Sequence, residues 1–151
     1  MHVQSSIKWL KIASATLIGF GFLSVLGAHP SVDALARWFI SIAIWPFAEL
    51  TAVTDTETRL LWAILGGICV GWGVMFWLLT THLFEAHHEK LRPIMIKAVL
   101  SWFIVDSLAS IASGAAFNAV LNLSFFALFL YPLWRPVQSD HTSANLEAKM
   151  S

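Results

Sequence analysis

The chain has 151 residues, of which 58% are hydrophobic and only 12% are charged, and its mean hydropathy is +0.72. A soluble domain of this length cannot bury that much apolar surface, so the composition indicates an integral membrane protein whose main partner is the lipid bilayer. The formal net charge of zero gives no reason to expect a nucleic acid as a partner.

The charged residues fall mainly in short groups that separate four long apolar runs. A helix needs roughly 20 consecutive apolar residues to cross a bilayer, and its backbone groups are then hydrogen-bonded within the helix. The sequence therefore predicts an all-α fold, a transmembrane bundle formed by residues 1–138 and followed by a flexible tail at 139–151. The predicted membrane-spanning helices cover residues 7–28, 60–81, 94–114 and 115–133.

The first run also has features of a secretory signal peptide. A basic start and an apolar core precede the small residues Ala34 to Ala36, which resemble a cleavage site. Removal of residues 1–36 is therefore an alternative, and it would not change the orientation of the remaining helices.

A shorter apolar segment, residues 32–46, lies between the first and second runs. It is too short to cross comfortably, and Asp33, Arg37 and Ser41 recur at every fourth residue, so they share one side of a helix. Pro46 ends the helical pattern. We predict a helix that lies in the membrane interface, or that dips into the bilayer and returns.

The distribution of Lys and Arg predicts the orientation of the four spans, because cytoplasmic loops are enriched in these residues. With both chain ends in the cytoplasm, only Arg37 and Arg59 lie on the outer side. Making the short segment a true span would move several cations outside, so four spans are favoured. The predicted cytoplasmic cations are Lys8, Lys11, Lys90, Arg92, Lys97, Arg135 and Lys149.

One aspartate, Asp106, lies inside the third apolar run. Ser110 and Ser113 follow it at helical spacing, and the very short link to the fourth run predicts a tight antiparallel hairpin that places Asn118 and Asn122 opposite them. We predict that these five residues form a polar seam. An ionisable group inside a span is costly, so Asp106 either binds a proton, a cation or a substrate, or only fixes how the helices pack.

The second run offers small residues at a similar depth, namely Gly66, Gly67, Gly71 and Gly73. Gly67 and Gly71 have the spacing that lets two membrane helices approach closely, so we predict that this surface takes part in helix packing. A glycine-rich surface near a carboxylate is compatible with tight packing and with a small cavity, and the sequence leaves both open.

A cluster of histidines and glutamates, T-H-L-F-E-A-H-H-E-K, occupies residues 81–90. Glu85 and His88 have a spacing found in di-metal helical bundles, and a continuous helix would align His82, Glu85 and Glu89. Such sites need further ligands from other helices, which this sequence lacks. We therefore predict a solvated linker and no metal, with a metal site or a pH-sensitive hinge as alternatives.

The residue types exclude several chemistries. Cys69 is the only cysteine, so the chain cannot form a paired-thiol redox site by itself. No histidine lies in the middle of a predicted span, which argues against haem, and the sequence contains no phosphate-binding loop or serine hydrolase motif. We predict no catalytic residue and no cofactor.

Two segments resemble a group of known proteins. L-W-A-I-L-G-G-I-C-V-G-W-G-V at 61–74 and W-F-I-V-D-S-L-A-S-I-A-S-G-A-A-F-N-A-V-L-N at 102–122 are similar to uncharacterised small four-helix membrane proteins of bacteria. The resemblance covers the second half of the chain. It implies a four-helix architecture in a bacterial inner membrane, and it implies no activity.

Two classes of function are compatible with these features. The first is a non-enzymatic bundle that self-associates or is an accessory subunit of a larger membrane complex, because membrane helices associate through small residues and polar contacts. The alternative is a small proton- or cation-coupled transporter or channel component that uses Asp106. An ion pair to Asp106 from Arg37 or Arg59 would require either side chain to reach about two helical turns inward. An enzyme built on the cluster at 81–90 ranks third.

Overall fold

The computed structural model describes residues 3–46 and 55–134, and the predicted tail at 139–151 lies outside them. The described residues form five helices, and four of these are long and apolar enough to cross a membrane, which confirms that prediction from the sequence. The helices are α1 (Val3–Gly27), α2 (Ala34–Ala43), α3 (Thr56–His82), α4 (Phe84–Ala112) and α5 (Ala116–Trp134).

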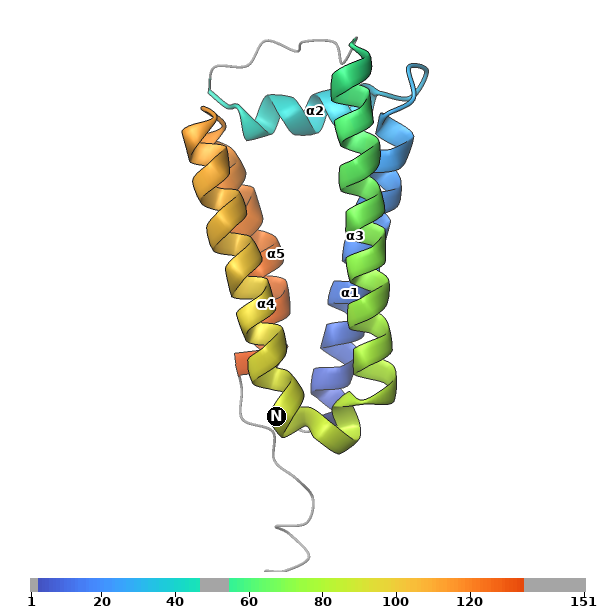
Figure 1. Cartoon of the computed structure of the whole chain (residues 1–151), viewed down its shortest axis with the longest axis vertical. Coiled ribbons are helices and arrows are strands. Elements are labelled where there is room, and N and C mark those ends of the chain that lie inside the picture. Colours follow the sequence, from blue (N-terminus) through green and yellow to red (C-terminus); the bar gives the residue numbers. More distant parts are fainter. Residues whose placement is uncertain (1–2, 47–54, 135–151) are drawn as a thin grey trace, which may run out of the picture.

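The long helices form two antiparallel pairs (Figure 1). α1 packs against α3, α4 packs against α5, and the two pairs meet mainly through α1 and α5. At one end of the molecule, α2 lies across the bundle between the two pairs, and we call this the α2 end. At the opposite end, α3 passes into α4 through the single residue Leu83, and we call this the Leu83 end.

The junction between α3 and α4 differs from the sequence-based expectation of a linker. Leu83 (φ −122°, ψ −25°) interrupts the helix, and α4 already begins at Phe84, ten residues before the predicted start at 94. α4 then kinks at His87 (φ −130°, ψ 24°) and continues through Pro93. Apart from Leu83, the residues between the two predicted spans thus belong to helices, and the reversal of direction depends on two local departures from helical geometry, at Leu83 and at His87.

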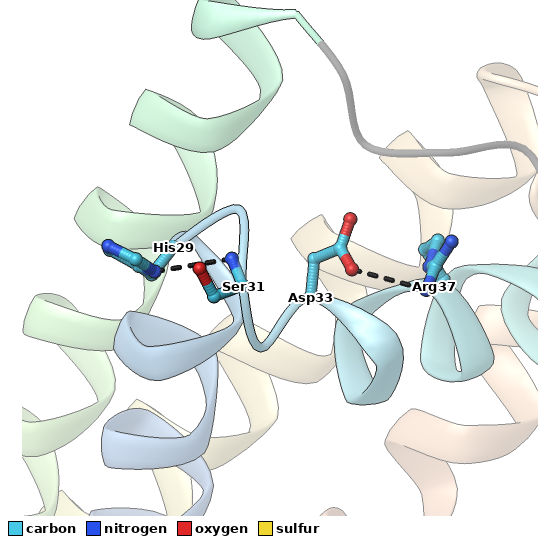
Figure 2. Close-up of polar contacts among 4 residues, drawn as sticks. All are labelled: His29, Ser31, Asp33 and Arg37. Atoms are coloured by element: carbon cyan, nitrogen blue, oxygen red, sulfur yellow. Dashed lines mark hydrogen bonds and ion pairs between the residues drawn. The ribbon is translucent and has the colours of Figure 1, made fainter.

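α2 covers the middle of the segment predicted at 32–46, and its first turn is held by local polar contacts (Figure 2). The Asp33 carboxylate forms an ion pair with Arg37, with 3.2 Å between Oδ1 and the guanidinium nitrogen. The backbone N–H of Ser31 donates to His29 Nδ1 at 3.2 Å in the preceding turn. These contacts fix the corner at which the chain leaves α1 and turns across the bundle.

The contact between α1 and α3 depends on glycine. A Cβ atom added at Gly66 would lie 2.5 Å from the carbonyl oxygen of Gly21, and one added at Gly21 would lie 2.7 Å from the carbonyl oxygen of Gly66. Lower in the pair, a Cβ at Gly73 would lie 3.0 Å from the carbonyl oxygen of Ser14. The two backbones therefore approach more closely than any side chain at these positions would allow.

The four glycines predicted to pack are divided between two faces of α3. Gly66 and Gly73 are buried against α1, whereas Gly67 and Gly71 are exposed, and a Cβ at either would meet nothing within 4 Å. The spacing of Gly67 and Gly71 suggested that this pair packs against another helix, but the contact with α1 is made by Gly66 and Gly73. Residues seven apart share a helix face just as residues four apart do, so the spacing alone does not distinguish the two pairs.

The main core lies in the half of the bundle nearest the Leu83 end. Its buried residues come from all four long helices: Ile7, Leu10, Ala13, Leu17, Phe76, Phe84, Met95, Val99, Phe129 and Leu133. A second, smaller group at the α2 end joins Ala36 of α2 to Trp62 of α3. Between these two packed regions, the helical pairs are less closely packed.

Arg92 connects the α4–α5 pair at the Leu83 end. Its Nε and one terminal nitrogen donate to the carbonyl oxygen of Leu133 at 2.9 and 2.7 Å, and the terminal nitrogen also donates to the carbonyl oxygen of Trp134 at 3.1 Å. These carbonyls belong to the last turn of α5, which has no later N–H groups of its own helix to bond them. Arg92 therefore caps α5 from α4.

We expect Arg92→Ala to destabilise the protein by about 1 kcal/mol or more, because the end of α5 then loses charge-assisted hydrogen bonds. Thermal unfolding in a mild detergent is the measurement. Lys97→Ala, which removes an exposed cation from the same helix, is the matched control and should have little effect. If both variants lose the same amount of stability, the loss comes from the removed positive charge and not from the hydrogen bonds of Arg92 to α5.

Asp55 caps the start of α3. Its Oδ2 accepts hydrogen bonds from the backbone N–H of Thr58 at 2.8 Å and from the Thr58 hydroxyl at 2.7 Å. The hydroxyl bond is the main cause that lowers the pKa of Asp55 from its ordinary value of 3.8. Because the pKa of Asp55 is lower in the folded state than in the unfolded state, the ionised cap stabilises the fold fully at pH values above 3.8. This stabilisation is lost as the pH falls through the folded-state pKa.

We expect Asp55→Ala to lower the melting temperature at neutral pH and to have a smaller effect well below pH 3.8. Asp55→Asn keeps a side-chain oxygen that can accept the backbone hydrogen bond, so at neutral pH it should be milder than the alanine variant. Thermal unfolding at both pH values tests this expectation. If Asp55→Ala lowers the melting temperature by the same amount at both pH values, the charge of Asp55 does not contribute to the cap.

Candidate functional site

A cavity of about 670 Å³ lies between the two helical pairs, and side chains from all five helices line it. Phe76, Val99 and Phe129 form its boundary with the main core, and Phe39 of α2 lines it at the opposite end. The cavity therefore occupies the region between the two packed ends of the bundle. Its volume lies within the range of sites that bind drug-sized molecules.

Aromatic contacts between the helical pairs frame this cavity. Trp72 of α3 and Trp102 of α4 meet at 6.2 Å between ring centroids, and Phe76 of α3 and Phe129 of α5 meet at 4.9 Å. Phe20 of α1 contacts rings on both α2 and α5, each at 5.4 Å between centroids. Large flat side chains thus bridge the pairs and hold them apart, and most of the cavity wall is apolar.

The polar residues of the wall are Asp106, Asn118 and Asn122, which are hydrogen-bonded to one another, and the serines Ser101 and Ser124. The amide nitrogen of Asn118 donates to Asp106 Oδ2 at 3.4 Å, and the amide nitrogen of Asn122 donates to the same oxygen. Asn122 is buried, whereas Asp106 and Asn118 are half-buried. The carboxylate is therefore held against α5 by two amides and still borders the cavity.

Two further hydrogen bonds extend this cluster along the hairpin. Asn118 also donates to Ser110 Oγ at 2.9 Å, as the predicted seam requires, and Asn122 donates to Ser107 Oγ at 3.4 Å. Ser107 was not included in the predicted seam because it does not follow Asp106 at helical spacing. Ser107 could have been predicted from its position next to Asp106, because the Asn122 amide is long enough to contact both residues on α4.

Ser113 does not join the cluster. Its hydroxyl donates to the backbone carbonyl of Ser110 at 3.0 Å, and the residue is exposed at the turn between α4 and α5. The turn is three residues long, and Gly114 takes a φ of +85° in it, a conformation that glycine adopts without strain. This short turn sets the register that brings Asn118 and Asn122 to the level of Asp106.

Asp106 is the only Asp, Glu, Lys, Arg or His among the described residues that line the cavity. Arg37, one of the two arginines considered as a distant partner for Asp106, pairs with Asp33 at the start of α2 (Figure 2). Cys69, whose thiol is half-buried, lines the same cavity from α3. The site thus combines one carboxylate, two amides, two serine hydroxyls and a thiol with a largely aromatic and aliphatic wall.

The residues considered for a metal site are separated by the breaks in the helices. His82 ends α3, whereas Glu85, His88 and Glu89 belong to α4 on either side of its kink. Glu85 accepts a hydrogen bond from Gln4 of α1 at 3.1 Å. Within residues 3–46 and 55–134, no three His, Cys, Asp or Glu side chains are grouped as a metal ion would require.

Comparison of the chain with models of protein families, with curated proteins and with solved structures finds no match. The function is therefore inferred from the geometry of the site itself.

Proposed function

We propose that this protein is a four-span membrane protein that binds an amphiphilic small molecule within the bilayer, as the substrate site of a small transporter. The observation that carries the proposal is the position of Asp106 in the wall of a cavity of about 670 Å³. If Asp106 served only to pack α4 against α5, its carboxylate would be enclosed between the two helices. Instead it borders a space large enough for a ligand.

The orientation predicted from the charges is part of this proposal. Both chain ends lie in the cytoplasm, and α2 lies along the outer interface of the membrane. The placement of α2 across one end of the bundle supports an interfacial position for this helix, since its ten residues are too few to span the bilayer (Figure 1). A bacterial inner-membrane location, which the resemblance noted in the sequence implies, is part of this proposal too.

Filling the cavity tests the proposal. Ala98→Phe places an aromatic ring in the cavity from α4, and Ser124→Phe does so from α5. Ala109→Phe adds the same ring to an exposed position of α4 outside the cavity and is the matched control. Each protein is purified in mild detergent, its folding is checked by thermal unfolding, and the compounds that co-purify are extracted and identified by mass spectrometry.

We expect an amphiphilic compound in near-stoichiometric amount with the wild type and with Ala109→Phe, and a strong reduction of that compound with both filled variants. The proposal is wrong if folded proteins of all four kinds carry the same compounds in the same amounts. It is also wrong if the wild type carries nothing beyond detergent and bulk lipid.

Self-association is a second candidate function, and the exposed face of α3 favours it. Gly67 and Gly71 lie on this face with open space around them, and Ile64 beside them is 49% exposed. Small residues four apart in an apolar helix let a second helix approach closely. Gly71→Leu should convert a dimer or larger assembly to the monomer in mild detergent, measured by light scattering. A wild type that is already monomeric would exclude this function.

A further inference from the structure

We propose that the cavity selects organic cations, namely amphiphilic molecules in which a protonated amine is attached to an apolar body about as long as the cavity. This inference rests on the proposed function and specifies its ligand. It follows from the charge, the hydrogen-bonding capacity, the wall chemistry and the length of the site.

Charge is the first argument. Among the described residues of the cavity wall, Asp106 is acidic and none is Lys, Arg or His. In a low-dielectric site an anionic ligand would be repelled by the carboxylate, whereas a cation would compensate it. A ligand with a positive head group therefore completes an electrostatic pair that the described protein residues leave open.

Hydrogen bonding leads to the same conclusion. The amides of Asn118 and Asn122 both donate to Asp106 Oδ2, and no described residue donates to Asp106 Oδ1. This second carboxylate oxygen is the acceptor that is left for a ligand. A head group that donates N–H bonds is the complement of such an acceptor, and a charged donor makes the stronger bond.

The apolar wall suits the remainder of such a molecule. Trp72, Trp102 and Phe125 line the cavity together with Asp106, and aromatic faces attract cations as well as apolar groups. Along α3 the lining extends from Leu65 to Phe76, a distance of about 16 Å at the helical rise of 1.5 Å per residue. A single alkyl chain or a small ring system of this length would reach from one end of the lining to the other.

A bare metal cation does not fit the same features. Alkali and alkaline-earth ions are held by about six oxygen ligands at short distance, and such sites are compact. Here the oxygen-bearing side chains form only one part of a wall that is otherwise apolar, around a volume of about 670 Å³. The site is too large and too apolar for an ion alone, so the cation that it selects carries an apolar body.

Three ligands with the same chain and different head groups test this inference. Radiolabelled decylamine, decanol and decanoate are each titrated into nanodiscs of phosphatidylcholine that contain the wild type, Ala98→Phe or Asp106→Asn. Binding to the cavity is defined as the saturable binding that is present in the wild type and absent in Ala98→Phe. This difference removes the contribution of ligand that only partitions into the lipid. Thermal unfolding confirms that each variant is folded.

We expect wild-type protein to bind decylamine about tenfold or more tightly than decanol, and to bind decanoate more weakly than either, as a charge-assisted hydrogen bond to Asp106 implies. Asp106→Asn should lower the affinity for decylamine by a similar factor and leave that for decanol nearly unchanged. The inference is overturned if decanol or decanoate binds as tightly as decylamine to the wild type, a comparison that needs no Asp106 variant.

The same data separate the two proposals. If decanol or decanoate shows saturable binding that Ala98→Phe removes, without a preference for the amine, the cavity is a ligand site and only the ligand class is wrong. If none of the three ligands shows such binding, the proposed function itself fails.

Discussion

Replacing Gly66 by alanine should destabilise the protein by about 1–3 kcal/mol, the usual cost of forcing an extra group into a well-packed contact. The added Cβ would lie 2.5 Å from the carbonyl oxygen of Gly21 and 2.8 Å from the backbone nitrogen of Val25. Neither backbone atom can move away by a simple rotation of a side chain. The two helices would have to separate, and the contacts around Gly21 and Gly73 would weaken with them.

Gly67→Ala is the matched control, because it makes the same chemical change one residue further along α3. A Cβ at Gly67 meets nothing within 4 Å, so this variant should be as stable as the wild type or slightly more stable, since alanine favours the helix. Unfolding in detergent by heat or by added sodium dodecyl sulfate compares the two. If Gly66→Ala proves as stable as Gly67→Ala, the backbones of α1 and α3 do not approach each other as closely at Gly66 as described.

Asn122→Leu should also destabilise the protein, by about 1–3 kcal/mol, because it removes a donor from the Asp106 carboxylate and leaves that half-buried group with only the Asn118 amide as a partner. Asn122 is only 7% exposed, so water cannot readily replace its amide. Adding Asp106→Leu to this variant should restore most of the lost stability, since replacing both partners of a buried hydrogen bond by apolar groups can be nearly neutral.

The double variant also separates packing from function. A protein with leucine at both positions should fold and still contain the cavity, yet it should have lost its preference for decylamine. The stabilities of the wild type, both single variants and the double variant form a thermodynamic cycle that measures the coupling between Asp106 and Asn122. Additive effects would show that the two side chains do not interact, and the geometry proposed for the site would then be wrong.

The parts of the fold that the sequence predicts well are those that depend on local patterns. Long apolar runs predict the four long helices, because a bilayer requires each helix to satisfy its own backbone. The pairing of Asp106 and Ser110 with Asn118 and Asn122 is predictable for a similar reason. With only three residues between α4 and α5, the register of the hairpin follows from counting along two helices.

The parts that depend on how distant helices meet are not predictable in this way. Periodicity cannot show whether α3 uses Gly66 and Gly73 or Gly67 and Gly71, because both pairs share a face and the partner helix is unknown. The sequence leaves tight packing and a cavity near Asp106 equally open, since the cavity arises where Phe20, Trp72 and Trp102 hold the two pairs apart. The break at Leu83 is equally hidden, because no proline or glycine marks it.

The short hairpin formed by α4 and α5 has a further consequence for how the chain is made. Asn118 and Asn122 follow Asp106 by only 12 and 16 residues, so the partners of the carboxylate emerge from the ribosome almost directly after it. If the two helices leave the translocation channel together as one unit, the carboxylate enters the lipid already bonded to its amides. The cost of inserting an acidic residue is then met locally, before α1, α2 and α3 have assembled around it.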